Sequence, residues 1–233
     1  EEQMTIEGKR QSIPLTEGPS RAAARSYLRG AGYSKDDLHK PIIGIANTWT
    51  EIGTCNVHLR EVAEALKEGI REAGGTPMEF NTVTISDGIT MGTQGMKASL
   101  ISREVIADSV ELVARGNLFD GIICIAGCDK NMPGSVIAMA RLNRPALMVY
   151  GGTIRAGHAQ GKPRDIISAF QSYGEYLAGT ITDEQRLDIV RHACPGAGAC
   201  GGMYTANTMA VAIEALGLSL PYWRMFVISA IGM

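Results

Sequence analysis

A thiol, a carboxylate and an amine stand in a row at Cys128, Asp129 and Lys130, directly after an apolar run at 122–125. That run has the composition of a short buried strand, and Gly127 ends it. Open α/β sheets bind their ligands at the carboxyl ends of such strands. Thiolates and carboxylates can hold a metal there, whereas Lys130 is explained equally well as a salt-bridge partner or as a group that binds or reacts.

Other residues with metal-binding side chains lie far apart in the chain. Cys55 precedes His58 by three positions, a spacing that suits a metal pair but is as often structural. Cys200 lies in a glycine-rich turn before an expected helix, where backbone amides lower the pKa of a thiol. Asp87 precedes a glycine, and taken alone it is more often a turn or capping residue. Each signal is weak until the fold brings these residues together.

Apolar periodicity predicts an alternation of strands and helices that would do so. Expected strands occupy 42–46, 78–85, 122–125 and 145–150, and expected helices occupy 16–30, 57–73, 102–114 and 135–142. A glycine-rich loop is expected at 86–95, and further helices at 165–177, 182–194 and 205–216. Strands joined by crossover helices run parallel. We therefore predict an α/β fold with an open, mostly parallel four-stranded sheet flanked by helices, with extra C-terminal helices.

In a parallel sheet the carboxyl ends of all strands lie on one edge, so the segments that leave these strands should converge. Cys55 and His58 follow the first expected strand, Asp87 the second and Cys128 the third. Thiol and carboxylate groups from separate loops on one edge indicate a metal site. The other two cysteines favour structural roles, Cys124 as a small buried hydrophobe within a strand and Cys194 at the end of a helix.

Bulk composition limits the classes of partner. The formal net charge of −2 gives no electrostatic reason to expect nucleic acid or an anionic membrane surface. An apolar fraction of 45% in 233 residues is enough for a substantial core, and no apolar run reaches a membrane span. Five scattered cysteines and no signal-peptide pattern favour a reducing compartment over secretion. Small molecules are the expected partners.

Six motifs in order, between about Gly18 and Tyr222, resemble dihydroxy-acid dehydratases, a lyase family related to sugar-acid dehydratases. The motifs are Cys55-Asn-Val-His58, Ser86-Asp-Gly-Ile-Thr-Met-Gly92, Ser102-Arg-Glu-Val-Ile-Ala-Asp-Ser109, Gly127-Cys-Asp-Lys-Asn-Met-Pro-Gly134, Tyr150-Gly-Gly152 and Gly198-Ala-Cys-Gly-Gly-Met-Tyr-Thr-Ala-Asn207. The fourth and fifth look more like the dihydroxy-acid branch than the sugar-acid branch.

The resemblance implies a [2Fe-2S] cluster held by Cys55, Cys128 and Cys200, with one iron position open to substrate. It also implies Mg²⁺ held by Asp87, Asp129 and a carbamylated Lys130. The implied reaction dehydrates 2,3-dihydroxy acids, such as 2,3-dihydroxyisovalerate, to 2-oxo acids in valine and isoleucine biosynthesis. A homodimer is implied, in bacterial cytoplasm or in mitochondria or plastids.

The family enzyme is longer than this chain. Its C-terminal barrel-like domain, with a further acidic Mg²⁺ ligand and the serine that acts as C2 base, is expected to be absent here. Residues 1–222 are expected to form the N-terminal iron-sulfur and Mg²⁺ domain, and 223–233 a divergent apolar tail, so the chain is interpreted as a truncated form.

Two hypotheses from other classes stay open beside the leading one. A structural or interaction domain could bind zinc through Cys55, His58, Cys128 and Cys200. A nucleotide-binding module would explain the glycine-rich turns, but no Gly-x-Gly-x-x-Gly follows the first expected strand.

Overall fold

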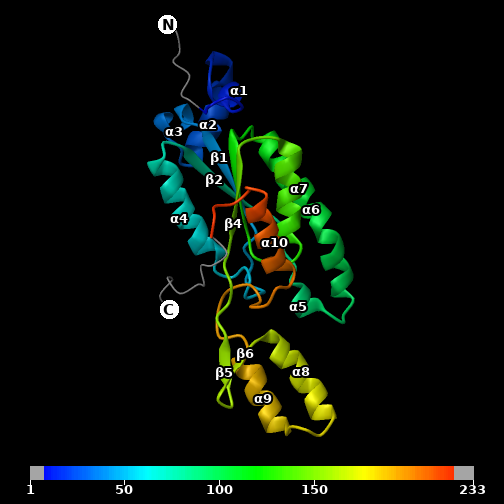
Figure 1. Cartoon of the computed structure of the whole chain (residues 1–233). Helices are drawn as coiled ribbons and strands as arrows, with labels where there is room; N and C mark the ends of the chain where they lie inside the picture. The colour runs from blue at the N-terminus through cyan, green and yellow to red at the C-terminus, as the bar shows by residue number, and fades with distance from the viewer. Residues whose placement is uncertain (1–7, 223–233) are drawn as a thin grey trace.

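A four-stranded parallel sheet forms the centre of the computed structural model, which describes residues 8–222 (Figure 1). Its strands lie in the order β2-β1-β3-β4. They are β1 (Ile42–Asn47), β2 (Thr76–Asn81), β3 (Gly121–Ala126) and β4 (Ala146–Tyr150). All three pairings are parallel, which confirms the predicted fold class and strand direction. The predicted tail at 223–233 lies outside the described residues.

Helices cover the sheet from both sides, as Figure 1 shows. They are α4 (Leu59–Glu72) on one face and α6 (Gly95–Gly116), α7 (Asn131–Leu142) and α10 (Thr205–Ala215) on the other. Leu59 of α4 packs with Ile45 and Ile125 of the sheet, and all three are fully buried. Ile106 and Met132 belong to the larger core on the opposite face. Burial of each such side chain stabilises the fold by roughly 1.5–3 kcal/mol relative to leaving it exposed. This packing holds the strands in place, together with the strand ends that carry the candidate site.

The segment before β1 is tied to the amino edge of the sheet by Asp120. Its buried carboxylate accepts five hydrogen bonds, from the backbone amides of Arg10, Gln11, Ser12 and Ile42 at 2.6–3.0 Å and from Ser12 Oγ at 2.6 Å. Burial opposes ionisation of Asp120, but these donors outweigh it and hold its pKa below the usual value. Asp120 therefore has a structural role at the edge remote from the candidate cysteines.

Four short elements precede β1 where one helix over 16–30 was predicted. They are α1 (Ile13–Thr16), a 3₁₀ turn (Pro19–Arg21), α2 (Ala22–Gly30) and α3 (Lys35–His39). Gly18 has φ +84°, which interrupts the helix before Pro19. The helix α3 was missed, although Ser34 and Asp37 form a capping box at its start.

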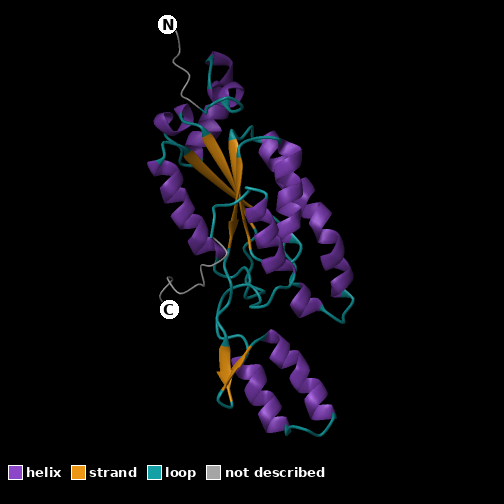
Figure 2. Cartoon of the chain, in the orientation of Figure 1, coloured by secondary structure: helices purple, strands orange, loops and turns teal. Residues whose placement is uncertain are grey.

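A helical arm lies beyond the carboxyl edge of the sheet (Figure 2). It consists of β5 (Gly157–Ala159), β6 (Lys162–Arg164), α8 (Ile166–Leu177) and α9 (Asp183–His192). Both helices were predicted, but the hairpin was not, because each strand has only three residues. Gln160 and Gly161 both have positive φ, 54° and 69°, the combination of a type I′ turn.

Three element boundaries differ from prediction near the candidate site. The strand β2 ends at Asn81, and the predicted loop contains a short helix, α5 (Asp87–Thr90). Helix α6 begins at Gly95 and not at 102. Helix α7 begins at Asn131, with Pro133 in its first turn, where the backbone N–H has no intrahelical partner to lose. Among residues 8–222, no helix combines the length and apolarity that a membrane crossing requires.

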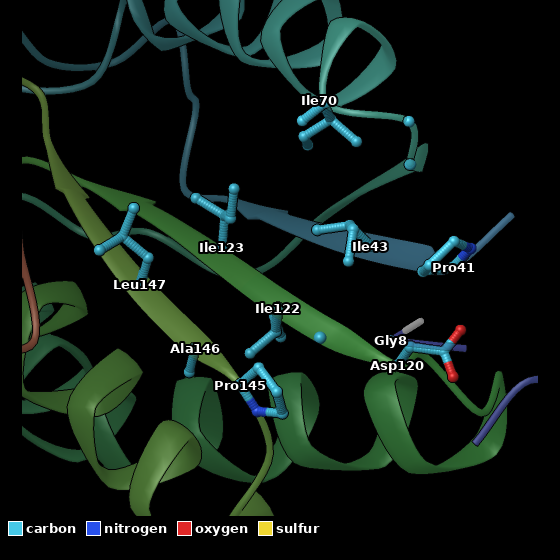
Figure 3. A pocket seen from close by; sticks show the side chains of 14 residues that line it. Gly8, Pro41, Ile43, Ile70, Asp120, Ile122, Ile123, Pro145, Ala146 and Leu147 are labelled. Atoms are coloured by element: carbon cyan, nitrogen blue, oxygen red, sulfur yellow. The ribbon is translucent and has the colours of Figure 1, made fainter. Parts of the chain in front are cut away.

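A cavity of about 610 Å³ opens at the amino ends of the strands, on the α4 side of the sheet (Figure 3). Ile43, Ile123 and Leu147 line it from three strands, and Ile70 lines it from α4. Its lining is mainly apolar, and its carboxylate, Asp120, is already engaged by five donors. The cavity therefore lies at the opposite edge of the sheet from the candidate metal-binding residues, and its apolar lining does not suit a metal.

Candidate functional site

The loop after β1 carries Cys55 to the carboxyl end of β3. Asn56 Nδ2 donates to the carbonyl and to the hydroxyl of Thr48, both at 2.9 Å, and Thr48 N donates to the Ile125 carbonyl. The Cys55 carbonyl lies directly against Gly127, so close that a Cβ there would clash with it. Gly127 is thus required for this approach, and it seats Cys55 beside Cys128.

Cys128 occupies the turn between β3 and α7. Its backbone N–H donates to Asn131 Oδ1 at 2.8 Å, and its carbonyl accepts from Met132 N at 3.2 Å. The side chain is 5% exposed, as is that of Cys55. The end of β3 and the first turn of α7 therefore hold this thiol in a fixed, buried position.

The Cys200 loop is fastened to the Cys55 loop and to the segment after β4. Gly198 N donates to the Thr54 carbonyl at 2.7 Å, and Ala199 N donates to the Gly152 carbonyl at 2.9 Å. Gly198 has φ +126°, and a Cβ there would lie 2.6 Å from the Ile154 Cα. Cys200 itself is half-buried. Three loops that are distant in sequence thus meet at one edge.

The Cys55 thiol interacts with the thiols of Cys128 and Cys200. Cys55 bonds to both of the others, and these bonds together with burial raise its pKa far above the usual value. The same bonds lower the pKa of Cys128 and bring that of Cys200 to about 7, against the effect of burial. Cys55 therefore keeps its proton beside two sulfurs whose pKa values are lowered, and three thiols grouped in this way are a donor set suited to a thiophilic metal.

An acidic cluster with one lysine lies beside the thiols. Lys130 Nζ is 2.8 Å from Asp87 Oδ2 and 3.9 Å from Asp129 Oδ2, so its ammonium group pairs with both carboxylates. Asp87 also accepts a hydrogen bond from Ser99 of α6. Burial opposes ionisation of Asp87, but bonds from Asp129, Lys130 and Ser99 keep its pKa low. Burial and the neighbouring Asp87 raise the pKa of Asp129 to about 6.

Comparison with known proteins shows the family of the chain. Residues 40–227 match the family model described as dihydroxy-acid/6-phosphogluconate dehydratase, N-terminal. The chain belongs to this family. It is 60% identical over 90% of its length to a dihydroxy-acid dehydratase of Koribacter versatilis, and 59% identical over 91% to the chloroplastic dihydroxy-acid dehydratase of Arabidopsis thaliana. The chain spans 37% and 35% of the lengths of these two relatives.

The side chains of the two candidate clusters in this family member interact with one another. Within residues 8–222, no group of three or more His, Cys, Asp or Glu side chains is arranged so that it could hold a metal ion as it stands. The thiols instead bond to one another, and the Lys130 ammonium pairs with the two carboxylates. Metal binding here requires loss of the proton that Cys55 holds and displacement or neutralisation of the Lys130 charge.

His58 and the other cysteines do not join the thiol hydrogen bonds described above. His58 Nε2 is 2.7 Å from the Gly151 carbonyl, to which it donates in its neutral form, and burial lowers the pKa of the ring. Its buried Nδ1 has no hydrogen-bond partner among the described residues. Cys124 is fully buried within β3, as predicted. Cys194 is exposed beyond the end of α9, and its structural role stays a prediction.

Several polar residues of the site were missed in the sequence. Ser99 was missed because the helix that carries it was predicted to begin at 102. Asn207 was noted within a motif but given no role, and it bonds to the Cys200 carbonyl at 2.8 Å. Ser86 bonds to Cys128, and Thr205 bonds to Asp129. The available signals were the position of Ser86 beside Asp87 and the positions of Thr205 and Asn207 at the start of α10. Hydroxyl and amide residues are too common at such places to be singled out from the sequence.

Proposed function

We propose that Cys55, Cys128 and Cys200 hold a [2Fe-2S] cluster. The observation that carries the proposal is the convergence of their three loops, because the Cys55 carbonyl lies against Gly127 next to Cys128 and Gly198 N donates to the Thr54 carbonyl at 2.7 Å. Cluster irons bind thiolates, and two of these thiols already have lowered pKa values. Three protein thiolates leave one coordination position for a substrate oxygen.

We further propose that Asp87, Asp129 and Lys130 form a Mg²⁺ site after carbamylation of the lysine. Addition of carbon dioxide to neutral Lys130 Nζ forms a C–N bond and releases a proton, which turns a cation into an oxygen ligand. Mg²⁺ prefers such hard oxygen donors. The Lys130 amine now lies between both carboxylates, so the carbamate would begin from the correct place. Ser99 would keep Asp87 oriented.

The proposed reaction is dehydration of a 2,3-dihydroxy acid in branched-chain amino-acid biosynthesis. The C2 proton and the C3 hydroxyl leave as water, and the resulting enol tautomerises to the 2-oxo acid. The two metal centres, when bound, supply Lewis acidity toward the hydroxyls and the carboxylate of the substrate. Asp129, half-buried at the same edge, would help orient that substrate. The C2 base is assigned to a serine in the C-terminal part of the family enzyme, outside this chain.

A sugar acid is the alternative substrate, since the family model covers both 6-phosphogluconate and dihydroxy-acid dehydratases. The relatives from Koribacter, Arabidopsis and Chloroflexus are all named dihydroxy-acid dehydratase, which supports the first choice. A full-length protein that contains this chain together with the C-terminal part of the family enzyme, reconstituted without oxygen, should form 2-oxo acid from 2,3-dihydroxyisovalerate and not from gluconate. The reverse preference, or no 2-oxo acid from either compound, would contradict the assignment.

Zinc binding without catalysis is the second candidate function. The observation in its favour is His58 Nδ1, because a buried ring nitrogen with no hydrogen-bond partner among residues 8–222 is available to ligate. Metal analysis of protein purified without oxygen separates the two. Iron with equimolar acid-labile sulfide supports the cluster, whereas zinc without sulfide, lost on His58→Ala, supports the structural site.

Oligomeric state and compartment are further proposals. We expect a homodimer, to be tested by light scattering on the purified protein. The Arabidopsis relative is named chloroplastic, which supports a plastid location for a plant form of this chain. A bacterial form would work in the cytoplasm, and localisation of a tagged full-length protein distinguishes these.

A further inference from the structure

We propose that Asn207 is the positioning residue that fixes Cys200 against Cys55 and Cys128. The inference rests on the proposed function of these thiols and extends it to a residue with no metal-binding role of its own. Asn207 lies in the first turn of α10 and is 9% exposed. Its side chain connects three separate parts of the site.

Both ends of the Asn207 amide are fully used. Nδ2 donates to the carbonyls of Cys200 and Gly202, at 2.8 and 2.7 Å. Oδ1 accepts from the Tyr150 hydroxyl at 2.6 Å and from Thr153 Oγ1 at 3.0 Å. A neutral amide has two N–H donors and an oxygen with two lone pairs, so this set of partners matches asparagine in full.

These partners place Asn207 between a rigid element and a flexible one. Tyr150 ends β4 and is buried, so it presents a fixed hydroxyl to the amide. The Cys200 loop, by contrast, has Gly198 before the cysteine and Gly201 and Gly202 after it. Glycines leave a backbone free to adopt many conformations. The two bonds from Nδ2, to the carbonyls of Cys200 and Gly202, restrict the backbone at the cysteine and directly after it.

The loop has other anchors, but they lie before the cysteine. Ala199 pairs with Thr153 in an isolated bridge, and Gly198 N donates to the Thr54 carbonyl. Between Cys200 and Gly202 the backbone carbonyls are held by Asn207, and the next anchor is Thr208 Oγ1, which donates to the Met203 carbonyl at 3.2 Å. Loss of the amide donors should therefore release Cys200 while Cys55 and Cys128, which are held by other residues, stay in place.

The test uses arsenite, a trivalent arsenical whose arsenic can bind three converging thiols with release of three waters, on the metal-free chain. Asn207→Asp keeps the oxygen that accepts from Tyr150 and Thr153 but loses both donors. Asn207→Leu loses all four bonds without adding charge. We expect each variant to bind the arsenical about tenfold more weakly, equivalent to about 1.4 kcal/mol. Asn117→Asp is the matched control, since its amide bonds only within the exposed end of α6 among the described residues.

Mass-spectrometric mapping of alkylated cysteines identifies which thiol is released. The proposal predicts that the arsenical no longer protects Cys200 in the Asn207 variants, while it still protects Cys55 and Cys128. Unchanged protection of Cys200, or equal loss at all three thiols, would overturn the proposal. So would weaker binding by Asn207→Asp alone, which would identify added charge as the cause.

Iron and sulfide loading of the parent chain is measured in parallel. A parent chain that binds the arsenical but no cluster would refute the proposed function, and the arsenical result would still decide the role of Asn207. Circular dichroism shows whether Asn207→Leu folds. If it does not, Cys200 mapping is compared between Asn207→Asp and two variants that add the same charge elsewhere, Asn117→Asp and Asn117→Glu.

Discussion

Replacing Gly127 by alanine should push the Cys55 loop away from the end of β3. The added Cβ would lie 3.3 Å from the carbonyl carbon of Cys55 and well inside contact distance of its oxygen. Neither partner is a flexible side chain, so the backbone itself must move. Overpacking of this kind costs about 1–3 kcal/mol. For a chain of this size that corresponds to a fall in Tm of about 2–12 °C.

The displacement should also separate Cys55 from Cys128, so that cluster loading falls by more than the loss of stability explains. Gly69→Ala is the matched control, because no described atom lies within 4 Å of its added Cβ and it lies in the exposed interior of α4. That change should raise stability by about 0.5–1 kcal/mol. Thermal unfolding and iron content are measured for both variants. A Gly127→Ala chain with normal Tm and full iron loading would refute the close-approach argument.

Two other sites give further predictions. Asp120→Asn should lower the free energy of unfolding by about 2–4 kcal/mol in urea titrations, because an amide nitrogen would face donors that now bond to a carboxylate oxygen. Because the pKa of Asp120 is held low, its stabilisation is complete above about pH 4, the unfolded value, and is lost as pH falls further. The Asp120→Asn variant should lack this acid-dependent loss, and a pH profile of stability like that of the parent chain would contradict the reasoning. Lys130→Arg should abolish both the mass gain of one carbon dioxide in bicarbonate and the rise in Tm with Mg²⁺, and persistence of either effect would argue against carbamylation.

The sheet was predictable because its strands bury apolar side chains on both faces and therefore appear as short continuous runs. Ile42, Ile45 and Ile125 are fully buried, and their runs were assigned correctly. The end of β2 was misplaced because Thr82 and Thr84 continue the alternation. Their hydroxyls instead bond outside the sheet, Thr82 to the Ser109 hydroxyl of α6 and Thr84 to the Thr48 carbonyl at 2.8 Å.

The start of α6 was misplaced because its pattern is inverted near the site. Ser99 points inward to Asp87 and is fully buried, whereas Leu100 and Ile101 are more than half exposed. Because apolar side chains point outward at the start of α6, this part of the sequence lacks the periodicity of a helix whose apolar face packs on the core.

Convergence of Cys55, Cys128 and Cys200 was predictable from strand direction and from the resemblance of the motifs. Their mutual bonding was not, since it depends on the Gly127 contact and on loop bonds such as Gly198 N to the Thr54 carbonyl. The role of Asn207 likewise follows only from three-dimensional distances, because its partners lie up to 57 positions away in the chain.

The most direct test of the central claim is the iron and acid-labile sulfide content of the chain purified without oxygen. The account predicts two irons and two sulfides per chain, lost when Cys55, Cys128 or Cys200 is changed to serine and retained in Cys194→Ser. Equal loss in Cys194→Ser, or a parent chain that binds zinc or no metal, would contradict it.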